Sequence, residues 1–153
     1  KIELGGTVDR GRLAEWLVAG RRRLEDAFGE QFVPALAPPW NNIATDVAVR
    51  LPELGFVGLS CDPGPPGVVP LKRVDIHVDA IAWHEGARSK EVGELEAELE
   101  AARAAVGAGP VGLLTHHLVI SEAGWEPLDR VLALGDDDAS VVWAGARELF
   151  GTP

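Results

Sequence analysis

The sequence predicts an α/β fold around a parallel sheet, because short apolar segments alternate with helical segments about five times along the chain. Proline, glycine or polar residues close the apolar segments, as they commonly close strands. The helical segments are long enough to form the crossover connections that parallel strands need. No linker, repeat or low-complexity segment interrupts this pattern, so the sequence indicates one domain over residues 1–153.

The first half of the chain is expected to begin with a helix that Asp9 or Thr7 caps and that runs to about Phe28. A strand should follow and end at Pro38-Pro39, because proline cannot donate a hydrogen bond to a neighbouring strand. This strand should cover residues 31–37. A helix over about 44–54 and a strand over 56–60 are expected to follow it.

The second half opens with a stiff loop over residues 61–70 that is rich in proline and glycine. Apolar residues at helical spacing predict a long helix to about Val106, with Ser89 as its cap. Ser121 is expected to cap another helix that ends near Gly135. Strands are expected over residues 73–82, 111–118 and 140–143, with a short helix at the end of the chain.

The composition narrows the range of partners. The formal net charge of -10 repels phosphate, so nucleic acid and anionic membranes are not expected partners, whereas a neutral or amine-bearing substrate is tolerated. No apolar run approaches the roughly 20 residues of a membrane-spanning helix. The single Cys61 excludes an internal disulfide. No signal peptide is visible, which leaves the compartment open with a slight preference for the cytoplasm, and a homo-oligomer is compatible with the sequence.

A first polar cluster lies in the strand expected over residues 73–82. Alternation along a strand places Asp75, His77 and Asp79 on one face. These side chains need water, a metal or polar partners, because burying them unpaired is costly. Two interpretations stay open, namely an exposed edge strand with a polar face and a polar strip in the mouth of a barrel.

A second cluster ends the apolar run of residues 112–118, where His116 and His117 follow each other. Ligands of parallel α/β folds bind at the carboxyl ends of the strands. Adjacent strand residues face opposite ways, so one of the two histidines is expected to point into a site. The alternative is that both are hydrogen-bonded structural histidines.

The third segment of interest is Pro38-Pro39-Trp40-Asn41. By itself it predicts a turn followed by a helix cap. An indole held by a rigid turn at the end of a strand could also stack on a sugar ring. Trp83, shortly after Asp79, is a second such surface or a core residue.

In order and spacing these three segments resemble the later motifs of the polysaccharide deacetylases (carbohydrate esterase family four, the NodB homology family). Pro38–Asn41 is similar to the third motif, which lines the substrate groove. Asp79–Trp83 is similar to the acidic and aromatic fourth motif, and Leu113–His116 to the fifth, an apolar strand that ends in a catalytic histidine. The resemblance covers roughly Val8 to Phe150.

The resemblance implies a metal-dependent hydrolase that removes an acetyl or similar acyl group from an amide on a sugar or related small molecule. His116 would be the acid that protonates the departing amine, and Asp79 would pair with it. The substrate would be lined by Trp40, Pro39, Asn41, His77, Trp83 and His117. The implied fold is a parallel (β/α) barrel of the deformed seven-stranded deacetylase type.

Two family motifs have no counterpart here, the Asp pair and the His-x-x-x-His pair that hold the family's metal. We therefore assign no metal ligand within residues 1–153 and expect a divalent ion, zinc or similar, to be held mostly by residues upstream of Lys1, where the front strands of the barrel would also lie. The position of the arginine in the third motif is occupied by Ala37 or Pro38. The alternative function is a non-catalytic carbohydrate-binding or scaffold domain that keeps the groove without the metal site.

Overall fold

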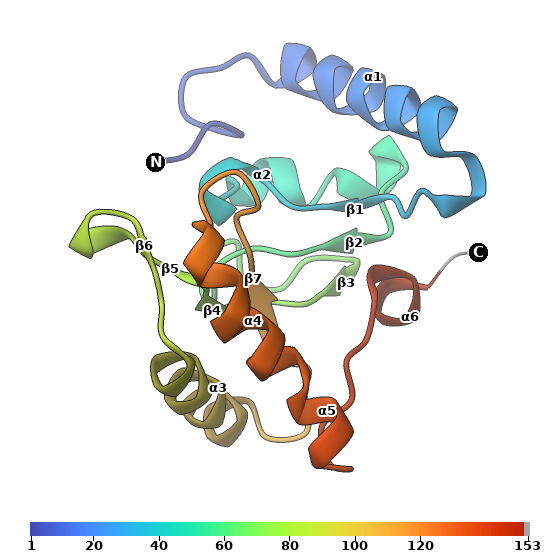
Figure 1. Cartoon of the computed structure of the whole chain (residues 1–153). Coiled ribbons are helices and arrows are strands. Elements are labelled where there is room, and N and C mark those ends of the chain that lie inside the picture. The colour runs from blue at the N-terminus through green and yellow to red at the C-terminus, as the bar shows by residue number, and fades with distance from the viewer. Residues whose placement is uncertain (152–153) are drawn as a thin grey trace. The chain divides into compact units, whose positions relative to one another are not determined.

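The computed structural model describes residues 1–151, which form two compact units. The first unit comprises residues 1–75 and 145–151, and the second comprises residues 76–144. Figure 1 shows the elements of both units coloured along the chain. That residues 1–153 belong to a single domain stays a prediction.

The first unit is built on a small sheet in the order β1–β2–β3. All three strands are parallel, as the alternation of strands and helices predicts. The elements of this unit are α1 (Arg10–Phe28), η1 (Gly29–Gln31), β1 (Ala35–Leu36), η2 (Pro39–Asn41), α2 (Thr45–Ala48), η3 (Leu51–Leu54), β2 (Gly58–Leu59), β3 (Lys72–Arg73) and α6 (Ala146–Phe150).

Helix α1 has the bounds and the cap that the sequence predicts. The Asp9 carboxylate accepts a hydrogen bond from the backbone N of Arg12 at 2.8 Å, and Gly29 follows the last turn with a φ of 53°. The helix buries Leu13 and Leu17. These side chains join the core of the unit, whose other buried members are Ile43, Val47, Ala48, Leu51, Phe56, Leu59, Cys61 and Val69.

The other elements of the first unit are shorter than the sequence predicts. Strand β1 occupies two of the residues 31–37, and β2 occupies two of the residues 56–60. The helix expected over residues 44–54 is divided into α2 and η3. Pro52 has no N–H with which to continue the hydrogen bonds of α2, which accounts for the division.

The proline-rich loop after β2 is organised by one arginine. Arg73 donates hydrogen bonds to the carbonyl oxygens of Asp62, Gly64 and Gly67 at 2.8, 3.0 and 2.8 Å. Its guanidinium also forms an ion pair with Asp75. The planar group can make these bonds at once because it carries five N–H donors. The loop is therefore irregular but tied at several points.

The second unit contains a parallel pair, β4–β7, and an antiparallel pair, β5–β6. Helix α3 packs on β4 and on α4 over a core of Val78, Ala80, Leu95, Leu99 and Val131. The elements are β4 (Ile76–Asp79), β5 (Ile81–Ala82), η4 (Trp83–Glu85), β6 (Arg88–Ser89), α3 (Val92–Val106), β7 (Gly112–Leu114), η5 (Glu122–Gly124), α4 (Trp125–Leu132) and α5 (Leu134–Asp137).

The single strand predicted over residues 73–82 is wrong. The segment forms β3, β4 and β5, and Asp75 lies outside all three. The register between β4 and β7 shifts at His77, which is the extra residue of a β-bulge. At the end of β4 the Asp79 carboxylate accepts a hydrogen bond from the backbone N of Ile81 at 2.8 Å and turns the chain. The one polar face expected from strict alternation therefore does not form.

The predicted cap of α3 is also wrong. Ser89 lies in β6, and its hydroxyl accepts a hydrogen bond from the backbone N of Ser121 at 3.4 Å. The cap is Glu91, whose backbone N donates a hydrogen bond to the Glu94 carboxylate at 2.9 Å. Ser121 does precede a helical segment, as predicted, because η5 and then α4 follow it.

The strand predicted over residues 140–143 is absent from the structure, which describes all four residues. Polar contacts hold this segment instead. Trp143 Nε1 donates to the carbonyl oxygen of Leu132 at 2.8 Å, and Arg103 donates to the hydroxyl of Ser140 at 3.1 Å. The short terminal helix is present as α6.

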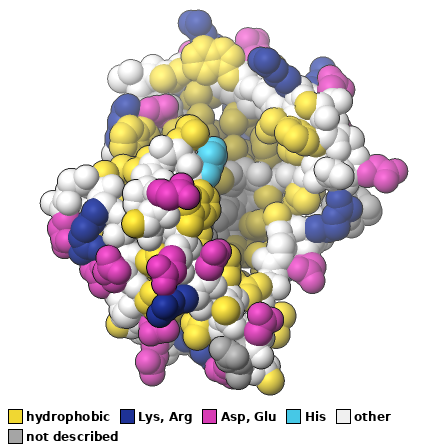
Figure 2. Space-filling view, in the orientation of Figure 1, with side chains coloured by type: hydrophobic (Ala, Val, Ile, Leu, Met, Phe, Trp, Pro, Cys, Tyr) yellow, Lys and Arg dark blue, Asp and Glu magenta, His cyan; other side chains and the backbone are white. Residues whose placement is uncertain are grey.

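Acidic side chains are numerous on the face shown in Figure 2, over the part that α3 and α4 occupy in Figure 1, with a few basic ones between them. This agrees with the net charge of -10. Among the helices of residues 1–151, none combines the length and the apolar character needed to cross a bilayer. The strands of these residues form three separate small sheets, and the closed barrel stays a prediction.

The start of α3 gives a prediction for acid stability. Arg88 donates two hydrogen bonds to the Glu94 carboxylate, at 2.7 and 2.8 Å, and this contact, followed by the backbone N–H of Glu91, lowers the pKa of Glu94 to about 2. A carboxyl group with a lowered pKa stabilises the fold above its unfolded pKa, here 4.5, and this contribution is lost as the pH falls toward 2. We expect Glu94→Gln to unfold at a lower denaturant concentration than the wild type at pH 7.

Denaturant unfolding at several pH values measures this effect, and the difference between Glu94→Gln and the wild type should shrink between pH 4.5 and 2. Glu96→Gln is the matched control, since Glu96 is an exposed glutamate of the same helix. A difference that stays constant over this range, or one that Glu96→Gln reproduces, contradicts the role given to Glu94.

Candidate active site

The candidate site is centred on the carboxylate of Asp79, at the carboxyl end of β4. Asp79 is paired with Leu114, the last residue of β7, and the backbone N of Ala80 donates to the Leu114 carbonyl at 2.9 Å. One carboxylate oxygen accepts from Ile81 N and the other from Trp83 Nε1, both at 2.8 Å. These two donors fix the orientation of the carboxylate independently of its third partner, His116.

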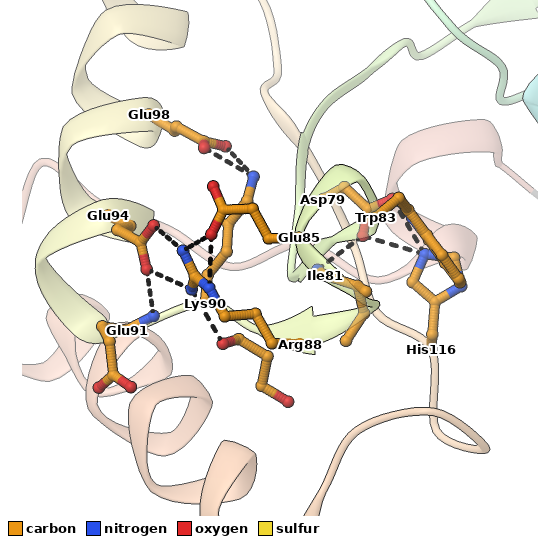
Figure 3. A network of polar contacts seen from close by, with 11 residues as sticks. Asp79, Ile81, Trp83, Glu85, Arg88, Lys90, Glu91, Glu94, Glu98 and His116 are labelled. Atoms are coloured by element: carbon orange, nitrogen blue, oxygen red, sulfur yellow. Dashed lines mark hydrogen bonds and ion pairs between the residues drawn. The ribbon is translucent and has the colours of Figure 1, made fainter.

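His116 is the third partner of this carboxylate and follows β7 by two residues. Its Nε2 lies 3.0 Å from Asp79 Oδ1 and 3.1 Å from Oδ2. The carbonyl oxygen of His116 accepts hydrogen bonds from the backbone N of Val119 and of Ile120 at 2.8 and 2.9 Å. The pair that the sequence predicts, Asp79 with His116, is therefore present in the structure, and Figure 3 shows the two side chains facing each other.

Trp83 completes the cluster from η4. Its ring meets the His116 ring edge to face, with centroids 5.0 Å apart and an angle of 89° between the planes. The indole is 48% exposed, so Trp83 is a surface of the site and not a core residue. The side chains of Asp79 and His116 are each 25% exposed. A bound molecule can therefore reach all three residues.

The geometry determines what His116 can do chemically. An ionised carboxylate only accepts hydrogen bonds, so the Nε2 atom that faces Asp79 carries a proton. The opposite nitrogen, Nδ1, is then the atom that can exchange a proton with a bound molecule. Asp79 contributes by holding the tautomer and the orientation of the ring, as an orienting carboxylate does for a catalytic imidazole.

A network of ion pairs supports the segment that carries Trp83. Arg88 Nε donates to Glu85 at 2.7 Å while its other nitrogens hold Glu94 at the start of α3. Lys90 Nζ lies 2.6 Å from Glu98. Figure 3 shows this network beside the Asp79 cluster. An open hollow adjoins Trp83 and is lined by Ile81, Ala82, Trp83, His84, Glu85 and Lys90.

Two other predicted site residues of the second unit lie away from this cluster. The Nδ1 atom of His77 accepts a hydrogen bond from the backbone N of Gly112 at 3.1 Å, at the opposite end of β4 from Asp79. This contact gives His77 a structural role between β4 and β7. His117 is exposed in the turn after β7, so only one of the two adjacent histidines faces the carboxylate.

The remaining predicted residues, Pro39, Trp40 and Asn41, belong to the first unit and form η2. Trp40 is 61% exposed. Trp40 and Asn41 have φ values of 60° and 50°, a conformation that residues other than glycine adopt at a cost of about 1–2 kcal/mol. Neighbouring contacts must hold this turn, and one of them is the hydrogen bond from Trp40 Nε1 to Glu3 at 2.8 Å.

The residues described here do not fit a catalytic metal by themselves. Within residues 1–151, excluding the side chain of Asp137, no three His, Cys, Asp or Glu side chains lie together as metal ligands would. A tight divalent site generally takes three or four ligands. Asp79 and His116 supply only two potential ligands, and these two side chains are in hydrogen-bond contact with each other.

Two contributions to these sites were not predicted from the sequence. Glu3 lies in a segment without a motif, and its contact with Trp40 joins residues 37 positions apart. The bond between Arg88 and Glu85 had a visible signal, since opposite charges three residues apart are often paired.

Comparisons of this chain with models of protein families, with curated proteins and with solved structures gave no match. The resemblance to the polysaccharide deacetylases therefore rests on the residues of this chain and on their arrangement.

Proposed function

We propose that this chain carries the acid side of the active site of a hydrolase that cleaves an N-acyl bond on a sugar or a related small molecule. The observation that supports the proposal most is the pairing of His116 with Asp79, beside an exposed tryptophan at the carboxyl ends of two parallel strands. An imidazole oriented by a carboxylate is a common arrangement for general acid–base chemistry.

In the proposed reaction, water adds to the acyl carbon and the bond between that carbon and the nitrogen then breaks. The departing nitrogen takes a proton from Nδ1 of His116 in its imidazolium form, the proton released by the attacking water returns to His116 through solvent, and the products are a carboxylate and a free amine. Asp79 keeps its hydrogen bond to Nε2 throughout and holds the ring toward the leaving group. Trp83 would pack against the acyl group or the sugar ring, since its indole is half exposed beside His116.

The resemblance also implies substrate-binding roles for the other lining residues. Trp40, Pro39 and Asn41 belong to the first unit and are proposed to contact substrate there, and Trp40 is exposed as this role requires. His117 is exposed and could contact substrate from the rim. His77 would act indirectly, because its ring is bonded to the backbone of β7. A divalent metal, zinc or similar, is proposed as a cofactor held mostly by residues upstream of Lys1.

An assay for acetate and free amine tests this function. With chitotriose, an oligomer of three N-acetylglucosamine units, as substrate, we expect both products to appear in equal amounts with the complete protein and an added divalent metal. With a control substrate that has O-acetyl groups only, His116→Ala should lose less activity than it does with chitotriose, since an alcohol departs from an ester with less need of a proton from His116 than an amine departing from an amide.

The opposing outcomes are equally clear. Binding of chitotriose without product, in the presence of zinc, manganese and cobalt in turn, contradicts the hydrolase and supports the non-catalytic carbohydrate-binding alternative. If chitotriose does not bind and no product forms, the proposed class of substrate is contradicted.

A further inference from the structure

An exposed tryptophan of the first unit is held by the amino-terminal segment. Trp40 Nε1 donates a hydrogen bond to Glu3 Oε1 at 2.8 Å. The Lys1 ammonium lies 2.9 Å from the same oxygen and 4.7 Å from the centroid of the Trp40 ring. Trp40 nevertheless keeps 61% of its surface exposed. The two residues therefore restrain an accessible aromatic side chain without burying it.

The segment that carries Glu3 is anchored independently of the tryptophan. Leu4 forms a parallel bridge with Ile43, and its carbonyl oxygen accepts from the backbone N of Ala44 at 2.9 Å. Gly5 permits this close approach, because a Cβ at that position would lie 2.7 Å from the Cβ of Ala44. The position of Glu3 thus follows from backbone pairing, and the contact with Trp40 is not its only support.

The backbone of Trp40 also needs support from outside. Trp40 and Asn41 both have positive φ values, a conformation that side chains other than glycine rarely adopt. Such conformations persist only where the surroundings hold them, and they are concentrated at functional sites. On one side, the Asn41 carbonyl accepts from the backbone N of Asp62 at 2.9 Å. On the other, Glu3 holds the indole.

From these contacts we infer that Glu3 is a positioning residue that orients the Trp40 indole for stacking on a pyranose ring of the N-acyl sugar. The inference rests on the proposed function, since it takes its ligand from there. Sugar rings stack on the face of an indole, whereas Glu3 holds the nitrogen at the edge of the ring. An orientation fixed before binding lowers the entropy lost when the ligand is bound.

The charge of Glu3 suits this role. Its hydrogen bond with Lys1, and then the one with Trp40, lower the pKa of the Glu3 carboxyl below its usual value. The carboxylate therefore stays ionised in neutral solution and accepts the indole N–H as a charge-assisted hydrogen bond, which is stronger than one between neutral groups.

Binding of chitotriose to the full chain, measured by calorimetry for a set of variants, tests the inference. Glu3→Ala should weaken binding by about 10-fold, the scale of one hydrogen bond to a charged group. Glu3→Gln should retain part of the affinity, because its amide oxygen can still accept the indole N–H. In a Trp40→Ala background, Glu3→Ala should have no further effect. Glu15→Ala, an exposed glutamate of α1, is the matched control and should bind as the wild type does.

A second measurement follows the contact itself. The sequence has five tryptophans, so a nitrogen–proton correlation spectrum should contain five indole signals, of which Trp40→Phe removes one and thereby assigns it. In Glu3→Ala this signal should shift and its proton should exchange faster with water, while the other four stay in place. Gly5→Ala should produce the same change without touching Glu3, because it displaces the anchored segment.

The outcomes separate this inference from the proposed function. An unmoved Trp40 signal in Glu3→Ala, or affinity equal to that of the wild type, overturns the role of Glu3 while leaving the sugar as ligand. A tenfold loss that persists in the Trp40→Ala background also overturns it, since Glu3 would then act by another route. A wild type that does not bind chitotriose overturns the proposed substrate, and the sugar role of Glu3 with it.

Discussion

Replacing His116 by Ala is expected to lower the turnover of an N-acetyl substrate by about 100-fold or more, the usual scale for losing a general acid. His116 is the one of the two adjacent histidines that faces a carboxylate, with Nε2 at 3.0 Å from Asp79 Oδ1. Without the imidazole, the amine must leave without its proton donor. The measurement is kcat for acetate release under saturating substrate.

His117→Ala is the matched control, because His117 is the neighbouring residue and is exposed in the turn. Its loss of turnover should be clearly smaller. Added imidazole should restore part of the activity of His116→Ala and none in His117→Ala, since only the first variant leaves a cavity next to Asp79. Equal losses in both variants, with metal content unchanged, would show that the wrong histidine or the wrong mechanism has been chosen.

The pairing of Asp79 with His116 could be predicted from the sequence, because the prediction does not require exact strand boundaries. Each residue follows an apolar segment, and the ends of neighbouring parallel strands lie at one edge of a sheet. A shift of one residue in either strand boundary would not have changed that expectation. Likewise α1 was predictable, because its cap, its apolar stripe and its terminal glycine all indicate the same bounds.

The details of the strand around Asp79 could not be predicted from the sequence. Strict alternation would place His77 beside Asp79, but the bulge at His77 shifts the register, and nothing in the residue types marks a bulge there. The carboxylate itself ends the strand by accepting the hydrogen bond of Ile81 N. The Asp79 side chain, which the sequence predicts to take part in catalysis, thus also determines the local backbone conformation. A prediction from hydrophobic periodicity does not include such hydrogen bonds between a side chain and the backbone.

The cap of α3 was mispredicted for a related reason. Serine is among the preferred residues at a helix start, and Ser89 stands shortly before the first apolar residue of the helical pattern. Its backbone, however, pairs with Ile81 in the β5–β6 hairpin, so the helix can begin only later. The Glu94 carboxylate then accepts a hydrogen bond from the backbone N of Glu91, a pairing that a run of glutamates hides in the sequence. A long-range pairing overrode the local preference.

Replacing Asp79 by Asn is expected to lower kcat by about 100-fold or more, because a general acid must be held in the correct geometry and tautomer. The asparagine oxygen can still accept from Ile81 N. The amide nitrogen at the other position can only donate, so it cannot accept from Trp83 Nε1, and its hydrogens oppose the N–H of His116 at 3.1 Å, although the oxygen stays within reach of His116. The ring of His116 then turns or adopts the other tautomer.

The same substitution should destabilise the fold by about 1 kcal/mol, the net value of one hydrogen bond, because the exposed indole N–H loses its acceptor but can bond to water instead. Asp129→Asn, an exposed aspartate of α4, is the control for the change of charge. Chemical denaturation shows how much of the Asp79→Asn protein is folded, and kcat is then expressed for the folded fraction only. A loss of activity that disappears after this correction would give Asp79 a structural role alone.

The combination of Asp79→Asn with His116→Ala separates positioning from every independent contribution. If Asp79 acts by orienting His116, the double variant should turn over about as slowly as His116→Ala alone, since groups that work as a unit are strongly non-additive. If the two losses multiply, Asp79 contributes by a route that does not pass through the imidazole. Because the two side chains lie 3.0 Å apart and also share Trp83 as a neighbour, coupling is expected to dominate, and kcat of the two single variants and the double variant measures it directly.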